Sequence, residues 1–200
     1  MVLHFLSGIG LAVVKKFVEL NAKVFVLDKE ESLLMELEKN FPTVTGIKVD
    51  LRDWFETGKV IESILPIHHL ANNAGIAPTK NILDIELSDI DPVFDINYKA
   101  MLRVGQIVAR GMIEFNISDG TIVNTGCLAD SSGNNSCALY SSSKAALSQL
   151  SKIMALEFAP FGIRVNNVRP GKLNTSSILN FRFIQITFTQ YIELTLDVKY

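Results

Sequence analysis

Short apolar runs alternate with longer amphipathic segments along most of this chain. The runs are Lys23 to Leu27, Thr45 to Val49, His69 to Ala71, Thr121 to Asn124 and Ile163 to Val168. Runs of this length are typical of strands that are buried on both faces of a sheet. The segments between them are long enough for crossover connections, so the pattern predicts a parallel sheet with helices on both faces. The predicted fold class is therefore α/β, a Rossmann-type doubly wound sheet.

Helical periodicity and capping signals predict the elements between these strands. The predicted helices are about Leu11 to Asn21, Glu30 to Asn40, Asp53 to Leu65, Asp91 to about Phe115, and Ser141 to Phe158. Asp91-Pro92 is a favourable helix start, because a carboxylate can cap the helix and proline suits its first turn. Gly162 is expected to end the last helix.

Composition excludes several classes of protein. The 200 residues suit one domain, and 48% hydrophobic with 20% charged residues is a globular composition. The net charge of -2 gives no electrostatic footprint for nucleic acid or an anionic membrane. No apolar run approaches the roughly 18 residues of a membrane helix, and Met1 to Leu6 lacks the features of a signal peptide. Cys127 and Cys137 suggest no disulfide framework, so we expect a reducing, cytoplasmic location and no metal site.

Tyr140 directly precedes the helix predicted from Ser141 to Phe158, and Lys144 lies four residues after it, a spacing that places the phenol and the ammonium on one face. A neighbouring cation lowers the pKa of a phenol, and such a tyrosine can exchange a proton with a carbonyl or alcohol oxygen. The alternative is an ordinary pair on a solvated helix face.

Two features of the first half of the chain suit a dinucleotide. Gly8 and Gly10 stand at a helix N-terminus, where a phosphate can approach backbone N–H groups, although a tight turn is the alternative. Asp28 ends a predicted strand roughly 18 residues after Gly10, near where a carboxylate that binds ribose hydroxyls belongs. The alternative for Asp28 is a helix N-cap. Lys29, beside it, would favour a 2'-phosphate that Asp28 repels.

Amide residues suggest a ligand crevice farther along. Asn72-Asn73-Ala74-Gly75 follows a strand at its carboxyl end, where ligands of α/β sheets bind, although a polar turn is the alternative. Asn97 falls inside a predicted helix, where an asparagine is more often solvated than catalytic.

Together these residues resemble the short-chain dehydrogenase/reductase family over about residues 7 to 175. The ordered set is Gly8-Ile9-Gly10, Asp50-Leu51, Asn72-Asn73-Ala74-Gly75, Asn97, Tyr140-x-x-x-Lys144 and Pro170-Gly171. Within the family, Asp50 to Trp54 and Gln106 to Gly111 are most similar to the branch of L-xylulose reductases and related carbonyl reductases. The resemblance implies a small-molecule carbonyl or alcohol substrate, an NAD(P) cofactor and a homodimer or homotetramer.

The resemblance also implies roles for individual residues. Tyr140 matches the family's proton donor, Lys144 the residue that assists it and holds the nicotinamide ribose, and Asn97 the anchor of a water-linked proton relay. The positions that match cofactor contacts are Gly8, Ile9, Gly10, Asp28, Asp50, Leu51, Asn73, Ala74, Gly75, Tyr140, Lys144, Pro170, Gly171, Leu173 and Thr175. Asp28 favours NAD, whereas the closest branch uses NADP.

Three departures from the family pattern accompany the resemblance. The family's first strand and first glycine are expected to be missing, because Met1 to Leu6 can supply at most a stub of strand. Cys127 stands thirteen residues before Tyr140, where the family has a serine that binds the substrate carbonyl, and a thiol is a weaker donor than a hydroxyl. After about Ser177 the family's last strand is also expected to be missing.

The sequence therefore predicts an incomplete Rossmann-like domain over residues 1–177 and a divergent tail over residues 178–200. The predicted function is NAD(P)-dependent reduction of a sugar or dicarbonyl, or the reverse oxidation, by hydride transfer with Tyr140 as acid and base. The alternative is an inactive fragment that retains at most nucleotide or subunit binding.

Overall fold

A computed structural model of the chain describes residues 2–3 and 8–171. The strands are β1 (Val2–Leu3), β2 (Val24–Asp28), β3 (Val44–Lys48), β4 (His69–Asn72), β5 (Thr121–Thr125) and β6 (Arg164–Val168). The α-helices are α1 (Ile9–Glu19), α2 (Glu31–Asn40), α3 (Trp54–Glu62), α4 (Leu87–Phe94), α5 (Met101–Glu114) and α6 (Ala138–Phe158). The described residues also form three short 3-10 helices, η1 (Ile82–Asp84), η3 (Leu128–Asp130) and η4 (Ala159–Phe161). One further segment, η2 (Asp95–Ala100), is π-helical.

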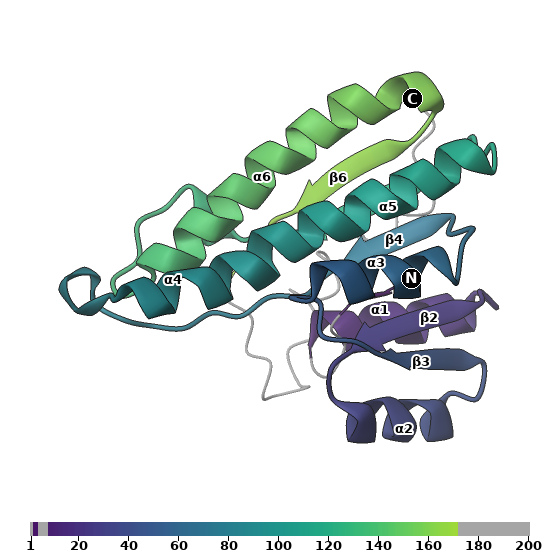
Figure 1. Ribbon diagram of the computed structural model, residues 1–200, viewed down its shortest axis with the longest axis horizontal. Helices are drawn as coiled ribbons and strands as arrows, with labels where there is room; N and C mark the ends of the chain where they lie inside the picture. The colour runs from purple at the N-terminus through teal and green to yellow at the C-terminus, as the bar shows by residue number, and fades with distance from the viewer. Residues whose placement is uncertain (1, 4–7, 172–200) are drawn as a thin grey trace.

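The described strands form one parallel sheet in the order β3-β2-β1-β4-β5-β6. The chain builds outward from β1 to β3 and then returns to the other side of β1 with β4 (Figure 1). Sheets with such a reversal of strand order usually bind ligands at the carboxyl ends of their strands, beside the point of reversal. The predicted α/β fold class is confirmed.

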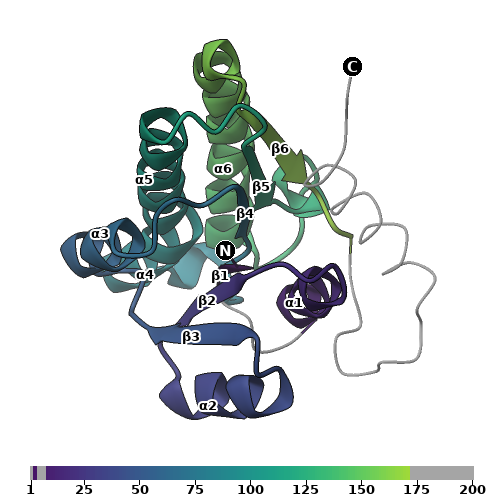
Figure 2. The same cartoon turned by 90° about the vertical axis from the view of Figure 1, so that its right-hand side faces the viewer.

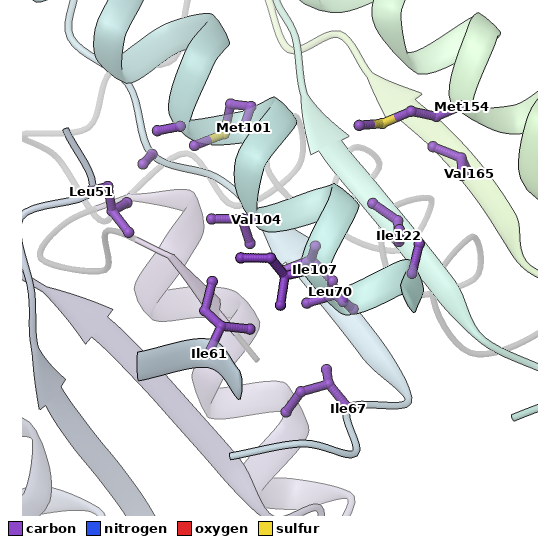
Figure 3. Close-up of a cluster of buried hydrophobic side chains, with 14 of the residues drawn as sticks. Leu51, Ile61, Ile67, Leu70, Met101, Val104, Ile107, Ile122, Met154 and Val165 are labelled. Atoms are coloured by element: carbon purple, nitrogen blue, oxygen red, sulfur yellow. The ribbon is translucent and has the colours of Figure 1, made fainter. Parts of the chain in front are cut away.

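Helices cover both faces of the sheet, with α1 on the side opposite α3, α5 and α6 (Figure 2). Consecutive residues of one strand enter different apolar cores, because side chains alternate across a strand. Ile122 packs into the core beneath α3, α5 and α6, whereas Val123 packs into the core beneath α1 and α2. The first of these cores joins Ile61, Ile107 and Met154 from the three helices on its face (Figure 3). Continuous apolar runs are therefore required in these strands.

The helix predicted from Asp91 begins earlier and changes its geometry. Helix α4 starts at Leu87, and the Asp89 carboxylate accepts a hydrogen bond from the Glu86 N–H at 2.8 Å. The prediction that Asp91-Pro92 starts the helix is wrong, because Pro92 lies inside α4. The π-helical segment η2 follows directly and leads into α5. Tertiary packing therefore tolerates a proline that the local rule places at a helix start.

The start of the last long helix also differs slightly from the prediction, whereas its end at Phe158 is confirmed. Helix α6 begins at Ala138, three residues before the predicted Ser141, and therefore contains Tyr140 as well as Lys144. Gly162 takes a left-handed conformation with φ of 73° after η4, as expected of a residue that ends a helix.

The first strand is present as the expected stub. Val2 pairs with Val26 of β2 and with Ala71 of β4, so β1 occupies the centre of the sheet with two residues. The expectation that the first strand is missing is therefore wrong, because Val2 and Leu3 form a strand at its place in the sheet. The predicted tail over residues 178–200 and the predicted absence of a last strand lie outside the described residues.

Candidate active site

A pocket at the carboxyl edge of the sheet gathers residues from three strand ends. Its cavity of about 150 Å³ is lined by Leu27, Asp28, Lys29, Val49, Asp50, Leu51, Arg52, Ala74, Gly75, Ile76, Pro92 and Ile96. Five of the residues predicted to contact a cofactor are among them: Asp28, Asp50, Leu51, Ala74 and Gly75. The fold therefore brings together positions that are far apart in the sequence, and their role as cofactor ligands stays a prediction.

Asp28 ends β2 and is 2% exposed. Its Oδ1 accepts a hydrogen bond from the Glu30 N–H at 3.1 Å, but the residue is not the N-cap of α2, which is Glu30. The capping alternative is therefore wrong. The Lys29 ammonium lies 3.6 Å from the Glu30 carboxylate and is exposed. The carboxylate of Asp28 thus lines the pocket while the neighbouring cation is paired beside it.

Asp50 contributes a second carboxylate to the same pocket. Arg52 donates to both of its oxygens from Nε at 3.0 Å and from Nη2 to Oδ2 at 2.5 Å. The hydrogen bonds from Arg52 hold the pKa of the Asp50 carboxyl below its usual range. This end of the pocket therefore carries an ionised carboxylate that forms an ion pair with Arg52.

Lys144 lies in the interior next to the end of β5. It is 3% exposed, and its Nζ donates to the Thr125 carbonyl oxygen at 2.7 Å. A solvated surface pair is therefore excluded as the explanation of Tyr140 and Lys144. A Cβ at position 75 would lie 3.2 Å from Lys144 Nζ and 3.2 Å from Asn97 Oδ1, so a side chain there would require both groups to shift by a few tenths of an ångström. Gly75 thus allows the backbone after β4 to approach both groups.

Asn97 is fully buried in η2, so the expectation of a solvated asparagine is wrong. Its Oδ1 accepts from the Ile76 N–H, and its Nδ2 donates to the Ile76 carbonyl, both at 2.9 Å. Nδ2 also donates to Ser143 Oγ at 2.9 Å, and that hydroxyl donates to the Tyr140 carbonyl at 2.7 Å. Asn97 therefore joins the segment that follows β4 to the helix that carries Tyr140. π-Helical turns of this kind occur frequently at functional sites.

Cys127 follows β5 and forms a hydrogen bond with the Tyr140 side chain. Its Sγ also accepts from the Ala129 N–H at 3.4 Å at the start of η3. The structure thus brings the thiol and the phenol together, and the role of Cys127 toward a substrate stays a prediction.

The pKa values of the central pair depart from the sequence-based prediction. Burial, the hydrogen bond to Cys127 and the negative charge that the thiols can carry raise the pKa of Tyr140 above its ordinary value. Burial lowers the pKa of Lys144 to about 8. The pKa of Tyr140 is therefore raised where a lowered value was predicted, because burial disfavours the charged form of the phenol. Tyr140 is accordingly a neutral phenol, suited to donate a proton.

The other predicted residues lie around this centre. Gly8 is the N-cap of α1 with φ of 63°, a conformation that favours glycine, and Ile9 and Gly10 open the helix. The Asn73 side chain accepts from Thr125 Oγ1 at 3.1 Å. Pro170 and Gly171 follow β6, and the Pro170 carbonyl accepts from the Leu128 N–H at 3.1 Å. Leu173 and Thr175 lie outside the described residues.

Three contributors were missed by sequence reasoning. Thr125 binds both Lys144 and Asn73, Ser143 links Asn97 to Tyr140, and Asp130 holds the turn after Cys127. Ser143 carried a weak signal, because it lies one turn after Tyr140 on the helix. The contacts of Thr125 and Asp130 join distant segments, and nothing local in the sequence marks them.

Comparison with known proteins gives a family match over most of the chain. The family described as short chain dehydrogenase matches residues 3–182. None of the helices in the described part of the chain is long and apolar enough to span a membrane.

Individual relatives agree with that family. L-xylulose reductase from Bos taurus is 36% identical over 82% of this chain and 67% of its own length. Carbonyl reductase [NADPH] 2 from Sus scrofa is 36% identical with the same coverage. The solved structure of NAD+-bound xylitol dehydrogenase is 30% identical, with a TM-score of 0.77, over 82% of this chain and 65% of the other. The chain thus spans about two thirds of the length of these relatives.

Proposed function

Because the chain belongs to the short-chain dehydrogenase family of NAD(P)-dependent oxidoreductases, we propose that Tyr140, Lys144, Asn97 and Cys127 form its active site. The proposed reaction interconverts a small carbonyl compound and its alcohol. The observation that carries the proposal is the contact of Tyr140 with Cys127 beside the buried Lys144, at the carboxyl edge of a parallel sheet.

The residues present fit a nicotinamide dinucleotide. Asp28 and Asp50 place carboxylates at the ends of β2 and β3 for the adenosine part, and the α1 N-terminus at Gly8 suits the pyrophosphate. Gly75 leaves room beside Lys144 and Asn97 that a Cβ would fill. When bound, the nicotinamide supplies or accepts a hydride.

The chain itself supplies the proton chemistry. In reduction, Tyr140 donates the phenolic proton to the oxygen that was the carbonyl oxygen, and in oxidation it takes the proton back. The Lys144 ammonium stabilises the phenolate that remains, because opposite charges nearby favour the ionised form. Cys127, which contacts the phenol, can donate a weak hydrogen bond to the same substrate oxygen.

The proposed substrates are ketoses, dicarbonyls and the corresponding polyols. Two relatives are named for L-xylulose and xylitol, which are a sugar ketone and a polyol. A small polar molecule of this kind presents one reactive carbonyl and several hydroxyls, and Asn, Ser and Cys side chains near the site can bind them by hydrogen bonds.

Tyr140→Phe tests the proposal directly. The reduction of L-xylulose and of diacetyl is measured with each reduced cofactor, together with cofactor affinity from nicotinamide fluorescence. Loss of the general acid should lower kcat by about 10²-fold or more, while the cofactor Kd should change little. Full turnover by the Tyr140→Phe variant would contradict the assignment.

A protein that binds nucleotide or a second subunit without turnover is the second candidate, and Cys127 favours it because a thiol donates only weakly. Cofactor binding without turnover in both the parent chain and a Cys127→Ser variant would support this candidate. Turnover by the parent chain would exclude it.

For the cofactor we propose NAD(H) over NADP(H). The buried carboxylate of Asp28 lines the pocket, and its charge should weaken binding of a 2'-phosphate by on the order of 1 kcal/mol. Arg52 is already paired with Asp50, which limits its use as a phosphate ligand. Fluorescence titration with NADH and NADPH measures which cofactor binds more tightly. Asp28→Asn should reduce the preference for NADH several-fold. Tighter binding of NADPH to the parent chain would refute the argument.

We further propose a homodimer in the cytoplasm. Helices α5 and α6, which are expected to pair across a two-fold axis, expose Ile113, Ile153 and Leu156. Both cysteines are free thiols, which suits a reducing compartment. Fluorescence microscopy of the tagged chain tests the location.

A further inference from the structure

A chain of polar side chains joins the turn that carries Cys127 to β6 and to α6. Asp130, the last residue of η3, lies three residues after Cys127, and its side chain is 4% exposed. One carboxylate oxygen accepts a hydrogen bond from Arg169 Nη2, and the other accepts one from the Ser148 hydroxyl. Asn167 Nδ2 donates to that hydroxyl at 2.6 Å. One buried carboxylate therefore links three elements.

The backbone of the turn lies against the end of β6. The Gly126 N–H donates to the Val168 carbonyl at 2.7 Å, and the Leu128 N–H donates to the Pro170 carbonyl at 3.1 Å. A Cβ at position 126 would come within 2.6 Å of Asn167 Oδ1, so only glycine allows this close approach. The turn is thus held by strand-like hydrogen bonds on one side and by the Asp130 carboxylate on the other.

The carboxylate also attaches the turn to the helix of the active site. Ser148 lies one helical turn after Lys144 and two after Tyr140 on α6. We propose that Asp130 is a positioning residue whose carboxylate, by binding Arg169 and Ser148, holds Cys127 against Tyr140. This inference rests on the proposed function, because the pair that it positions is the proposed acid and its neighbour.

Asp130→Asn is the informative change because it keeps the shape of the side chain and removes one acceptor. Arg169 and Ser148 each donate to a different oxygen of Asp130, and an amide has only one oxygen to offer. The amide NH2 would face a donor in place of the lost acceptor. The bond to one partner is therefore lost, and the turn should open more often.

Two thiols on the chain report the opening. Cys127 and Cys137 are both free and partly exposed, and Cys137 precedes α6 instead of lying in the turn. Alkylation of each by iodoacetamide is followed by peptide mass spectrometry in the full chain without cofactor. Asp130→Asn should accelerate alkylation of Cys127 about tenfold, which corresponds to roughly 1.4 kcal/mol in the closing of the turn. Alkylation of Cys137 should change less than about twofold on the same scale.

Three further variants complete the experiment. Arg169→Gln should reproduce the selective effect, and Arg169→Lys should restore most of the protection because the charge remains. The double variant Asp130→Asn, Arg169→Gln should be less reactive than the product of the two single effects, since both substitutions weaken the same ion pair. Glu31→Gln, which removes an exposed ion pair with Lys48 at 2.7 Å, is the control and should leave both thiols unchanged.

Equal acceleration of both thiols, or an unchanged ratio of the two rates in folded variants, would overturn the positioning role. If Asp130→Asn does not fold, the thiol rates of Arg169→Gln test the positioning role instead. The Arg169 side chain is 39% exposed and is therefore more easily replaced. Where turnover is measurable, Asp130→Asn should lower kcat and leave the cofactor Kd unchanged. Selective exposure of Cys127 in a chain that never reduces a carbonyl would support the positioning role while refuting the proposed function.

Discussion

Burial lowers the pKa of Lys144 to about 8 from 10.5. Below pH 8 both the folded and the unfolded chain carry the proton. Between about pH 8 and 10.5 the unfolded state binds the proton and the folded state does not, so the free energy of unfolding should rise with pH in this window. The contribution amounts to about 1.4 kcal/mol per pH unit.

Comparison with Lys144→Met isolates that contribution. Urea unfolding of both proteins between pH 7 and 10 should show stability of the parent chain rising relative to the variant above pH 8. Ionisation of Tyr140 acts in the opposite direction, but its raised pKa confines that effect to pH values above 10. A difference that stays constant with pH would show that Lys144 keeps its proton.

The second prediction for a single residue concerns the effect of Cys127 on the rate of reduction. Cys127→Ser replaces a weak donor with a stronger one next to Tyr140 and should raise kcat for diketone or sugar reduction. Losing an oxyanion donor costs roughly 10²–10³ in turnover, and a thiol retains part of that, so a gain of about tenfold is expected. Steady-state kinetics at saturating cofactor measures it.

Cys137→Ser is the control for Cys127→Ser, since it removes a thiol of similar exposure without changing the contact to Tyr140. The role assigned to position 127 is wrong if the cofactor binds tightly to Cys127→Ser and turnover does not rise.

Among the elements, the α4, η2 and α5 series is the one whose irregularity matters for the site. Proline inside α4 is followed by the π-helical turns of η2, which place Asn97 against the segment after β4. Asn97→Leu would remove bonds to both backbone groups of Ile76 and to Ser143. Each buried polar group left unpaired costs about 1–3 kcal/mol, so we expect a loss of a few kcal/mol in the free energy of unfolding.

Chemical denaturation of Asn97→Leu beside Asn40→Leu checks this prediction. Asn40 is exposed at the end of α2, and its replacement should change stability by less than about 0.5 kcal/mol. Similar losses in the two variants would mean that the bonds of Asn97 contribute little.

For the whole molecule, we expect the exposed faces of α5 and α6 to determine whether the chain forms a dimer. Leu156 on α6 is 76% exposed, and burial of a leucine contributes about 1.5–3 kcal/mol. A two-fold axis would bury two copies, so Leu156→Glu should weaken a dimer on the order of 100-fold. Analytical ultracentrifugation over a range of concentrations measures the change.

Leu20→Glu provides the matched control, because Leu20 is 47% exposed at the end of α1 on the opposite side of the sheet. A parent chain that sediments as a folded monomer at micromolar concentration would refute the dimer.

The sequence by itself determined the order and type of most elements and the identity of the candidate site residues. Strands such as β2 and β5 are recognisable because a strand buried on both faces needs a continuous apolar run, which is a local property. The spacing of Tyr140 and Lys144 likewise follows from the geometry of one helix. The start of α4 at Leu87 was missed, because tertiary packing outweighs the preference of proline for a first turn.

Only the tertiary structure decided what those residues experience. Lys144 is buried by segments that precede it by as many as 69 residues, including Gly75 and Thr125. No local pattern could therefore show that burial would lower its pKa. Asn97 is buried for the same reason, through Ile76 and Ser143. The link from Asp130 to Arg169 and Ser148 also joins distant segments. Desolvation and hydrogen bonding depend on which atoms surround a group, and the surroundings here come from remote parts of the chain.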